Sequence, residues 1–342
     1  MSKSSVILTL ILTLSLGPAV GVMPAQAAKF EIKLSHSAPS VPDRVEVAAR
    51  IFKDYVEKAT NGDIIVTTYP ASQLGGEREQ AEGVQMGTIE MAALSTGPIP
   101  GMYPEIMLLD LPFIFPDMES AHALLDGPYL QRTADDMLKK TGTMRLLGFF
   151  ENGFRCFTGN RPLTKPADFK GMKFRLMENP MHQAMVKSLG GIPSTIPFAE
   201  VYTALAQGVV DGQENPLSLI YSMRFYEVQK HMILDQHVYN PYLVLINNDF
   251  FMNLPENYRK IIEDGSRVFI EEERKLNVIQ SNEGLEYMKS QGMSVVVPSP
   301  EVLKEFKDST METHAILRKR FGDKLVDDFL ADVDKAIAAT RK

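Results

Sequence analysis

One stretch of the sequence restricts the possible folds more than any other. Residues 255–291 contain no internal proline and carry apolar residues at helical spacing. Pro255 suits the first turn of a helix, and Gly292 suits its end. An unbroken helix of this length would measure roughly 55 Å, more than the roughly 30 Å diameter of a small domain. Gly265 and Gly284 could each break it at a cost of about 1 kcal/mol relative to alanine, so two or three shorter helices are the alternative.

The rest of the chain alternates strand patterns with helix patterns. Strand patterns occur at residues 30–34, 64–69, 89–94, 144–150 and 173–176. Helix patterns occur at residues 45–59, 77–86, 181–189, 198–207 and 326–339. Such alternation favours a mainly parallel sheet covered by helices. Because 342 residues correspond to about two domains, we expect an α/β fold of two lobes with one long helix that braces both.

The first 27 residues have the pattern of an export signal. Lys3 supplies a positive start, residues 6–16 form an uncharged apolar core, and small residues flank position 26. We therefore predict a signal peptide, residues 1–27, that is cleaved after Ala27. The alternative is an uncleaved anchor, because the uncharged run approaches the length of about 20 residues that a membrane span needs.

The composition excludes several classes of protein. With 44% hydrophobic and 23% charged residues, the chain is typical of soluble globular proteins. Its 36 Lys and Arg against 43 Asp and Glu give a net charge of −7, without the basic patch that a nucleic-acid binder needs. A single cysteine, Cys156, excludes an intramolecular disulfide and a Cys-rich zinc site. The six histidines lack metal-ligand spacing, so we expect neither metal nor cofactor.

Common catalytic motifs are also absent from the sequence. It contains no phosphate-binding loop, no G-x-G-x-x-G and no G-x-S-x-G. Neighbouring acids such as Asp135 and Asp136 lie in polar helical stretches, where carboxylates are usually solvated. We therefore expect a protein that is not an enzyme. Distant residues can still assemble a catalytic pair, so an exported enzyme that uses Glu77 or His36 as acid or base is an alternative hypothesis.

Two arginines are placed where a ligand could reach them. Arg155 follows the apolar strand pattern at 144–150, and Arg175 lies within the pattern at 173–176. Ligands of open α/β sheets bind at the carboxyl ends of strands, and a guanidinium group matches a carboxylate with two parallel hydrogen bonds. For each arginine the alternative is an ion pair with a nearby acid. A dense polar cluster at 211–216 follows the apolar pair at 209–210.

Several segments together resemble the DctP-type solute-binding proteins of tripartite ATP-independent periplasmic (TRAP) transporters. These segments are residues 29–37, 69–78, 168–175, 197–205, 207–216 and 225–230. The most specific of them contains Gly-Gln-Glu-Asn-Pro at 212–216. The resemblance implies a two-lobed periplasmic binding fold, type II-like, whose lobes close about a hinge. Lobe I would comprise residues 28–152 plus 241–280, and lobe II residues 153–240 plus 281–342.

The resemblance also implies which residues bind the ligand. In the family, an arginine at the position of Arg175 pairs with the ligand carboxylate, and Arg155 matches a second arginine that many members use. Asn215 matches an asparagine that hydrogen-bonds the ligand. Further polar and aromatic side chains complete the predicted ligand-binding set: Glu77, His36, Asn152, Phe198, Glu178 and His237.

The same residues favour a sugar acid, a uronate or an aldonate, as the ligand. Glu178 stands where some sialic-acid binders have an amide, which disfavours sialic acid. Many binders of C4-dicarboxylates have lysine at the position of Arg155 and a different residue at that of Pro216. An ionised Glu77 in the pocket would also repel the second carboxylate of succinate or malate.

We therefore expect a periplasmic protein that captures a small carboxylate and delivers it to TRAP membrane subunits. Nucleic acid is not an expected partner, and neither is direct membrane insertion of the mature chain. Two alternatives within this family stay open. The ligand could be a C4-dicarboxylate or another carboxylate, and the protein could serve a sensor kinase in place of a transporter.

Overall fold

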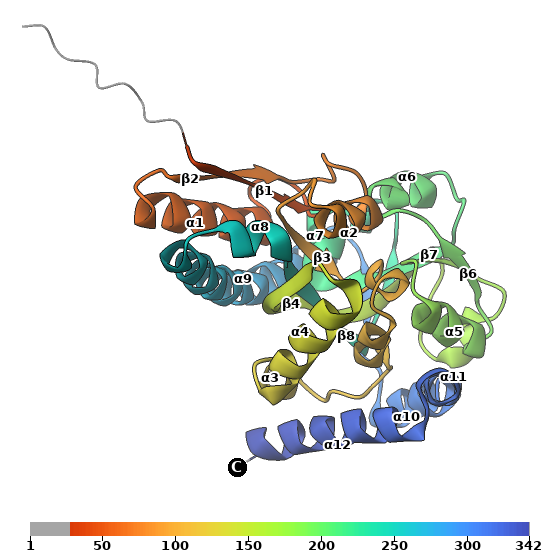
Figure 1. Ribbon diagram of the computed structural model, residues 1–342. Coiled ribbons are helices and arrows are strands. Elements are labelled where there is room, and N and C mark those ends of the chain that lie inside the picture. Colours follow the sequence, from red (N-terminus) through yellow and green to blue (C-terminus); the bar gives the residue numbers. More distant parts are fainter. Residues whose placement is uncertain (1–27, 342) are drawn as a thin grey trace, which may run out of the picture.

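The computed structural model describes residues 28–341, so the predicted signal peptide and its cleavage after Ala27 lie outside the described residues. The strands of the described chain form one mixed sheet (Figure 1). They are β1 Phe30–His36, β2 Ile64–Tyr69, β3 Met91–Ser95, β4 Met144–Gly159, β5 Lys173–Leu176, β6 Ile192–Thr195, β7 Gly212–Pro216, β8 His231–Asn247 and β9 Ser294–Val296. Their order across the sheet is β2-β1-β3-β8-β4-β7-β5-β6, and β9 pairs with β8.

Two long strands, β4 and β8, carry the sheet from one half of the molecule to the other. The end of β8 near Asn247 pairs with β3, which is followed by β1 and β2. The end of β4 near Gly159 pairs with β7, and β5 and β6 come next across the sheet. We use lobe I for the first half and lobe II for the second. Register shifts between Leu146 and Phe157 interrupt the β4–β8 pairing where the strands pass between the lobes.

The predicted parallel pairing is found inside each lobe but not at their junction. In lobe I, β1 pairs in parallel with β2 and β3, and in lobe II, β5 pairs in parallel with β6 and β7. The pairs β3–β8, β4–β7 and β4–β8 are antiparallel. The chain passes from lobe I to lobe II along β4 and returns along β8, so these two strands run in opposite directions.

Helices cover this sheet (Figure 1). They are α1 Arg44–Ala59, α2 Glu77–Met86, α3 Met118–Leu125, α4 Pro128–Thr141, α5 Pro180–Ser188, α6 Val201–Ala206, α7 Leu217–Ser222, α8 Asn248–Asn253, α9 Glu256–Ser290, α10 Pro300–Ser309, α11 Glu312–Phe321 and α12 Asp323–Thr340. Short 3₁₀ helices include η1 Ile99–Gly101, η2 Pro104–Asp110, η4 Phe198–Glu200 and η5 Phe225–Glu227. In the described residues no helix combines the length and apolar character that crossing a membrane requires.

The long helix is confirmed as one unbroken element of 35 residues, α9. It packs against α1 of lobe I, α7 of lobe II and the joining strand β4. Its two internal glycines lie where neighbouring elements come closest. A Cβ at Gly284 would lie 2.8 Å from Tyr221 Cβ in α7, and one at Gly265 would lie 3.1 Å from the Tyr55 ring in α1. The glycines therefore permit close packing and do not end the helix.

The C-terminal helices pass from lobe II back to lobe I. Phe306 of α10 is buried against Phe169 of lobe II, with ring centroids 5.5 Å apart. α12 packs against α3, and its buried Phe329 lies 5.7 Å from the Tyr129 ring in α4. Residues 323–340, predicted within lobe II, thus contact helices of the predicted lobe I. The residue boundaries of the two lobes stay predictions, whereas the α/β class and the helix along both lobes are confirmed.

Candidate functional site

A small cavity of about 100 Å³ lies between the lobes. Lobe I contributes the first turn of α2 and residues 97–98, and lobe II contributes the end of β5 with the residues after it, and residues 196–198. Four residues of the predicted set line it: Glu77, Arg175, Glu178 and Phe198. The structure therefore brings together predicted residues from two regions about 100 positions apart in the chain.

Arg175 is the buried cation of this cavity. Its side chain lies in β5 and the residue is 2% exposed. Nε donates a hydrogen bond of 2.9 Å to the Ile196 carbonyl, whereas Nη1 is buried without a hydrogen-bond partner in the described part of the chain. Burial, and after it the positive charge of Arg155, lowers the pKa of Arg175 to about 10. The guanidinium group thus stays charged at neutral pH, with hydrogen-bonding capacity left for an anion.

Phe198 and Glu178 complete the lobe II side of the cavity. The Phe198 ring centroid lies 5.9 Å from Arg175 Cζ, within the range of a cation–π contact. Glu178 is exposed, and its Oε2 lies 3.5 Å from Nη1 of Arg78 in lobe I. This ion pair therefore connects the two lobes at the rim of the cavity.

Glu77 places a carboxylate on the lobe I side. It is the first residue of α2, where the positive end of the helix dipole favours a negative charge. Ser37 Oγ donates to it over 3.0 Å, and the Ser95 backbone N–H donates over 3.2 Å. Ser95 Oγ donates to the other carboxylate oxygen. The cavity thus has a cation on one lobe and a hydrogen-bonded carboxylate on the other.

The other five predicted residues are buried and do not line the cavity: His36, Asn152, Arg155, Asn215 and His237. His36 is part of lobe I, where its Nε2 lies 3.1 Å from Glu46 Oε2. The remaining four belong to a buried polar network around β4, β7 and β8. Ligand contact by any of the five stays a prediction.

Arg155 forms the ion pair that the sequence left open as an alternative. Its Nε donates to Glu214 Oε2, and its Nη2 donates to Glu214 Oε1 over 2.9 Å. Nη2 also donates to Asn215 Oδ1 over 3.0 Å. Both side chains of the pair are fully buried. Arg155 thus has an internal carboxylate as partner, whereas Arg175 has none among the residues that the structure describes.

His237 and Asn152 extend the network on either side of Arg155. His237 Nε2 lies 3.2 Å from Glu214 Oε2, and its Nδ1 lies 2.8 Å from Asp235 Oδ2. Asn152 donates to Asn240 Oδ1 over 2.7 Å, and Asn240 Oδ1 also accepts from Arg155. The network therefore includes both strands that join the lobes.

Charges within this network shift the pKa values of its members. Burial opposes ionisation of Glu214, but Arg155, His182 and His237 outweigh it and hold the pKa of that carboxyl well below its usual value. Burial likewise opposes protonation of His237, yet Asp235 and Glu214 raise its pKa. The network is stabilised with the carboxylate ionised and the imidazole protonated.

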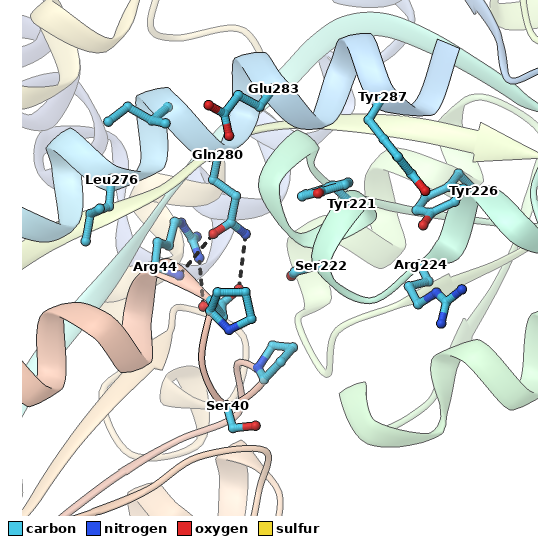
Figure 2. A pocket seen from close by; sticks show the side chains of 14 residues that line it. Ser40, Arg44, Tyr221, Ser222, Arg224, Tyr226, Leu276, Gln280, Glu283 and Tyr287 are labelled. Atoms are coloured by element: carbon cyan, nitrogen blue, oxygen red, sulfur yellow. Dashed lines mark hydrogen bonds and ion pairs between the residues drawn. The ribbon is translucent and has the colours of Figure 1, made fainter. Parts of the chain in front are cut away.

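A larger groove of about 510 Å³ lies between α9, the loop before α1 and the α7 region (Figure 2). Gln280 of α9 connects its walls. Its Oε1 accepts from the Arg44 N–H over 3.0 Å, and its Nε2 donates to Asp43 Oδ2 and the Ser218 carbonyl over 3.1 and 3.2 Å. Arg44 Nε lies 2.9 Å from Glu273 Oε1. Because no predicted residue lines this groove, we take the smaller cavity as the candidate site.

Met177 and Gly97 are among the residues lining the candidate site that sequence reasoning missed. Met177 follows Arg175 by two positions, and the strand period places such residues on the same face. That spacing could have identified Met177. Gly97 lies in a loop without a regular pattern, so no sequence signal indicated it. Glu214, the partner of Arg155, was part of the Gly-Gln-Glu-Asn-Pro segment but was not assigned a role.

Comparison with protein families gives one clear match. A model described as "Bacterial extracellular solute-binding protein, family 7" (DctP) matches residues 34–320. A solute-binding protein of Verminephrobacter eiseniae is 42% identical over 255 residues, 73% of this chain and 74% of that protein. The 2,3-diketo-L-gulonate-binding periplasmic protein YiaO of Escherichia coli is 34% identical, covering 80% of this chain and 82% of YiaO. The C4-dicarboxylate-binding periplasmic protein DctP of Rhodobacter capsulatus is also 34% identical, covering 86% and 84%.

Solved structures agree with this match. A TRAP periplasmic solute-binding protein from Polaromonas sp. JS666, bound to D-erythronate, has a TM-score of 0.83 at 34% identity and covers 88% of this chain and 98% of its own. One from Sulfurospirillum deleyianum, with bound succinate, has a TM-score of 0.83 at 32% identity and covers 89% and 99%. The chain therefore belongs to the DctP family of TRAP periplasmic solute-binding proteins, which bind solutes and are not enzymes.

Proposed function

We propose that this protein captures a sugar acid, an aldonate or a uronate, in the periplasm and delivers it to the membrane subunits of a TRAP transporter. The observation that carries the proposal is the buried Arg175 guanidinium, whose Nη1 has no hydrogen-bond partner among residues 28–341. A buried cation is costly unless an anion pairs with it. A ligand carboxylate at the cavity supplies that anion.

Glu77 supports a hydroxylated monoacid over a diacid. Its carboxylate accepts hydrogen bonds from Ser37 and Ser95 and lies on the lobe I side of the cavity. A ligand hydroxyl can donate to such an oxygen, whereas a second ligand carboxylate would be repelled by it. Two of the similar proteins are linked to sugar acids. YiaO is named for 2,3-diketo-L-gulonate, and the Polaromonas structure contains bound D-erythronate.

A binding screen followed by one substitution tests the proposal. Because the sequence contains no tryptophan, the screen is a dye-based thermal-shift assay with aldonates, uronates, C4-dicarboxylates and sialic acid. Ligand at 100 times its Kd adds about 2.7 kcal/mol to the free energy of unfolding. A shift with an aldonate or uronate supports the proposal, whereas a shift with diacids alone contradicts the sugar-acid assignment and favours C4-dicarboxylate transport.

The role of Arg175 is then tested by titration calorimetry with the ligand that the screen identifies. We expect Arg175→Ala to weaken binding by a factor of 100 or more, because loss of one partner of a buried ion pair costs roughly 3–5 kcal/mol. Arg267→Ala is the matched control, since Arg267 is 66% exposed on α9 and pairs with Asp264. Unchanged affinity in Arg175→Ala would remove Arg175 from the proposal.

A further inference from the structure

Two serines of lobe I hold the Glu77 carboxylate. Ser37 directly follows β1, and Ser95 is the last residue of β3. Both serines are buried, with 5% and 2% of their surfaces exposed. Because β1 and β3 pair in parallel, their carboxyl ends meet at the same edge of the sheet, where ligands of open α/β sheets bind. The sheet thus places both hydroxyls beside a carboxylate that lines the cavity.

The hydrogen bonds from these serines fix the orientation of the carboxylate. Ser95 donates to both of its oxygens, through the backbone N–H to Oε1 over 3.2 Å and through the hydroxyl to Oε2. Ser37 Oγ donates to Oε1 over 3.0 Å. Ser95 Oγ in turn accepts from the Gly97 N–H over 3.3 Å. Because one residue binds both oxygens, the Glu77 carboxylate cannot rotate without breaking two hydrogen bonds.

These bonds leave Glu77 with little spare capacity to accept others. An ionised carboxylate offers about four acceptor positions, two on each oxygen. Among residues 28–341, Oε1 accepts two hydrogen bonds and Oε2 accepts one. One acceptor position therefore remains, on Oε2. Each serine hydroxyl has a single proton and donates it to Glu77, so a ligand carboxylate finds no donor in this group.

We propose that Ser95 and Ser37 are positioning residues that determine specificity: they hold Glu77 so that its Oε2 accepts a hydrogen bond from one hydroxyl group of the ligand. This inference rests on the proposed function and adds how the site distinguishes a hydroxylated acid from one that lacks a hydroxyl at that place. Ser95 supplies two of the three hydrogen bonds and contributes more than Ser37. Neither serine contacts the ligand.

Titration calorimetry with four related acids tests the proposal. They are D-erythronate, the acid bound in the Polaromonas structure, and the three dihydroxybutanoates that each lack one of its hydroxyls. Loss of the hydroxyl that donates to Glu77 should weaken binding by about tenfold or more, the effect of losing a hydrogen bond to a charged group. One dihydroxybutanoate should therefore lack the contribution of Glu77.

The same four acids are then measured with Ser95→Ala. We expect this variant to bind D-erythronate about threefold or more weakly than the wild-type protein, because coupled groups show interaction energies of at least this size. The dihydroxybutanoate that lacks the Glu77-bound hydroxyl should bind Ser95→Ala and the wild-type protein equally well. A merely structural role of Ser95 would instead weaken all four acids by the same factor.

Three further variants complete the comparison. Ser37→Ala should show a smaller effect on the same hydroxyl, and Glu77→Ala should remove the effect of that hydroxyl altogether. Ser290→Ala is the matched control, because Ser290 is exposed on α9 and its Oγ donates to the Tyr287 carbonyl; it should leave all four affinities unchanged. Circular dichroism and the unfolding midpoint show whether each variant is folded. Equal weakening of all four acids in folded Ser95→Ala would overturn the proposal, as would unchanged binding of D-erythronate.

Failure of the proposed function gives a different result. If the wild-type protein binds only diacids, the sugar-acid assignment is wrong, and the role of the serines is judged on malate against succinate, which differ by one hydroxyl. Preference for malate, lost in Ser95→Ala, supports the positioning of Glu77 by Ser95. Equal binding of malate and succinate by the wild-type protein overturns it.

Discussion

Arg155 and Arg175 are two buried arginines of lobe II with opposite surroundings. Arg155 is ion-paired with Glu214, whereas Arg175 Nη1 has no hydrogen-bond partner within residues 28–341. In the sequence Arg155 follows one strand pattern and Arg175 lies within another, and nothing in these patterns shows which of the two is paired. The difference depends on β7, whose Glu214 lies beside Arg155 and which pairs with β5 only at Phe174 and Arg175. Residue type and spacing could therefore predict two candidate arginines, but not which of them is free to bind a ligand.

The Arg155–Glu214 pair leads to a prediction about stability. Arg155→Ala should lower the free energy of unfolding by roughly 3–5 kcal/mol, because it leaves a buried carboxylate without its main partner. The double variant Arg155→Met with Glu214→Leu should recover most of that loss, since apolar residues of similar volume can replace a buried ion pair. Urea unfolding of the wild-type protein and of the variants measures both effects. No recovery in the double variant would contradict this account.

A second prediction at this scale concerns pH. Burial raises the pKa of Glu273 to about 8, with Glu151 and Asp43 adding to the increase and Arg44 only partly opposing it. Because the pKa of Glu273 is higher in the folded than in the unfolded protein, its protonated carboxyl adds to the free energy of unfolding. This contribution is complete below the unfolded pKa of 4.5 and is lost as the pH rises through 8. The raised pKa of His237 acts in the same direction above its unfolded value of 6.5.

We therefore expect the unfolding midpoint to fall between pH 5 and pH 9. Glu273→Gln should flatten the part of the curve between the unfolded pKa and about 8, because glutamine does not ionise. Thermal unfolding in a series of buffers at constant ionic strength provides the measurement. A midpoint that rises with pH over this range would show that the Arg44–Glu273 ion pair outweighs burial.

At the scale of elements, regular hydrophobic patterns predicted the positions of helices and strands well. They did not identify a strand made of buried polar residues. The predicted strand at residues 173–176 and the predicted helix at 77–86 coincide with β5 and α2. By contrast, the polar segment 212–216 is itself a fully buried strand, β7, whereas Val209 before it is 47% exposed. Alternation of apolar and polar residues identifies strands only where one face meets water. In β7 the polar side chains are satisfied by partners from distant segments, which a local pattern does not contain.

The close packing of α9 on α7 leads to a prediction about stability. Gly284→Ala places a Cβ 2.8 Å from Tyr221 Cβ, so one of the two helices must shift. We expect a loss of about 1–3 kcal/mol from overpacking, more than the roughly 1 kcal/mol that alanine adds through helix propensity.

Gly101→Ala is the control for this substitution, because an added Cβ there meets no atom within 4 Å. It should leave stability unchanged or slightly raised. Urea unfolding of both variants compares them directly. Equal stability of Gly284→Ala and the wild-type protein would mean that α7 and α9 separate without cost.

At the scale of the whole molecule, the two lobes share buried contacts as well as a sheet. Asp110, at the end of η2, accepts hydrogen bonds of 2.6 Å from both Thr96 Oγ1 and Asn179 Nδ2. His182 Nε2 lies 3.3 Å from the same carboxylate. Thr96 follows β3 of lobe I, whereas Asn179 and His182 belong to the region of α5 in lobe II. A fully buried carboxylate thus links the lobes outside the joining strands.

We expect this coupling to make unfolding of the ligand-free protein a single transition, with equal calorimetric and van't Hoff enthalpies. Asp110→Ala leaves the Asn179 and Thr96 donors without their acceptor and should separate the transition into two. Differential scanning calorimetry distinguishes these cases. Asp308→Ala, which removes an exposed carboxylate on α10, should keep one transition. Two transitions in the wild-type protein would show that the lobes are independent.

The contrast between the buried network and the cavity wall has a consequence for evolution. Replacing Arg155 or Glu214 alone takes the main partner from a buried charge, so we expect each single change to be destabilising. Across the lobes, Met177 and Gly97 lie at van der Waals distance from each other, and the Met177 sulfur lies 3.5 Å from Ser95 Oγ. We therefore expect single mutations at these two positions to reshape the cavity wall without leaving a buried charge unpaired. The wall of the site can then change in small steps while the buried network and the scaffold stay intact.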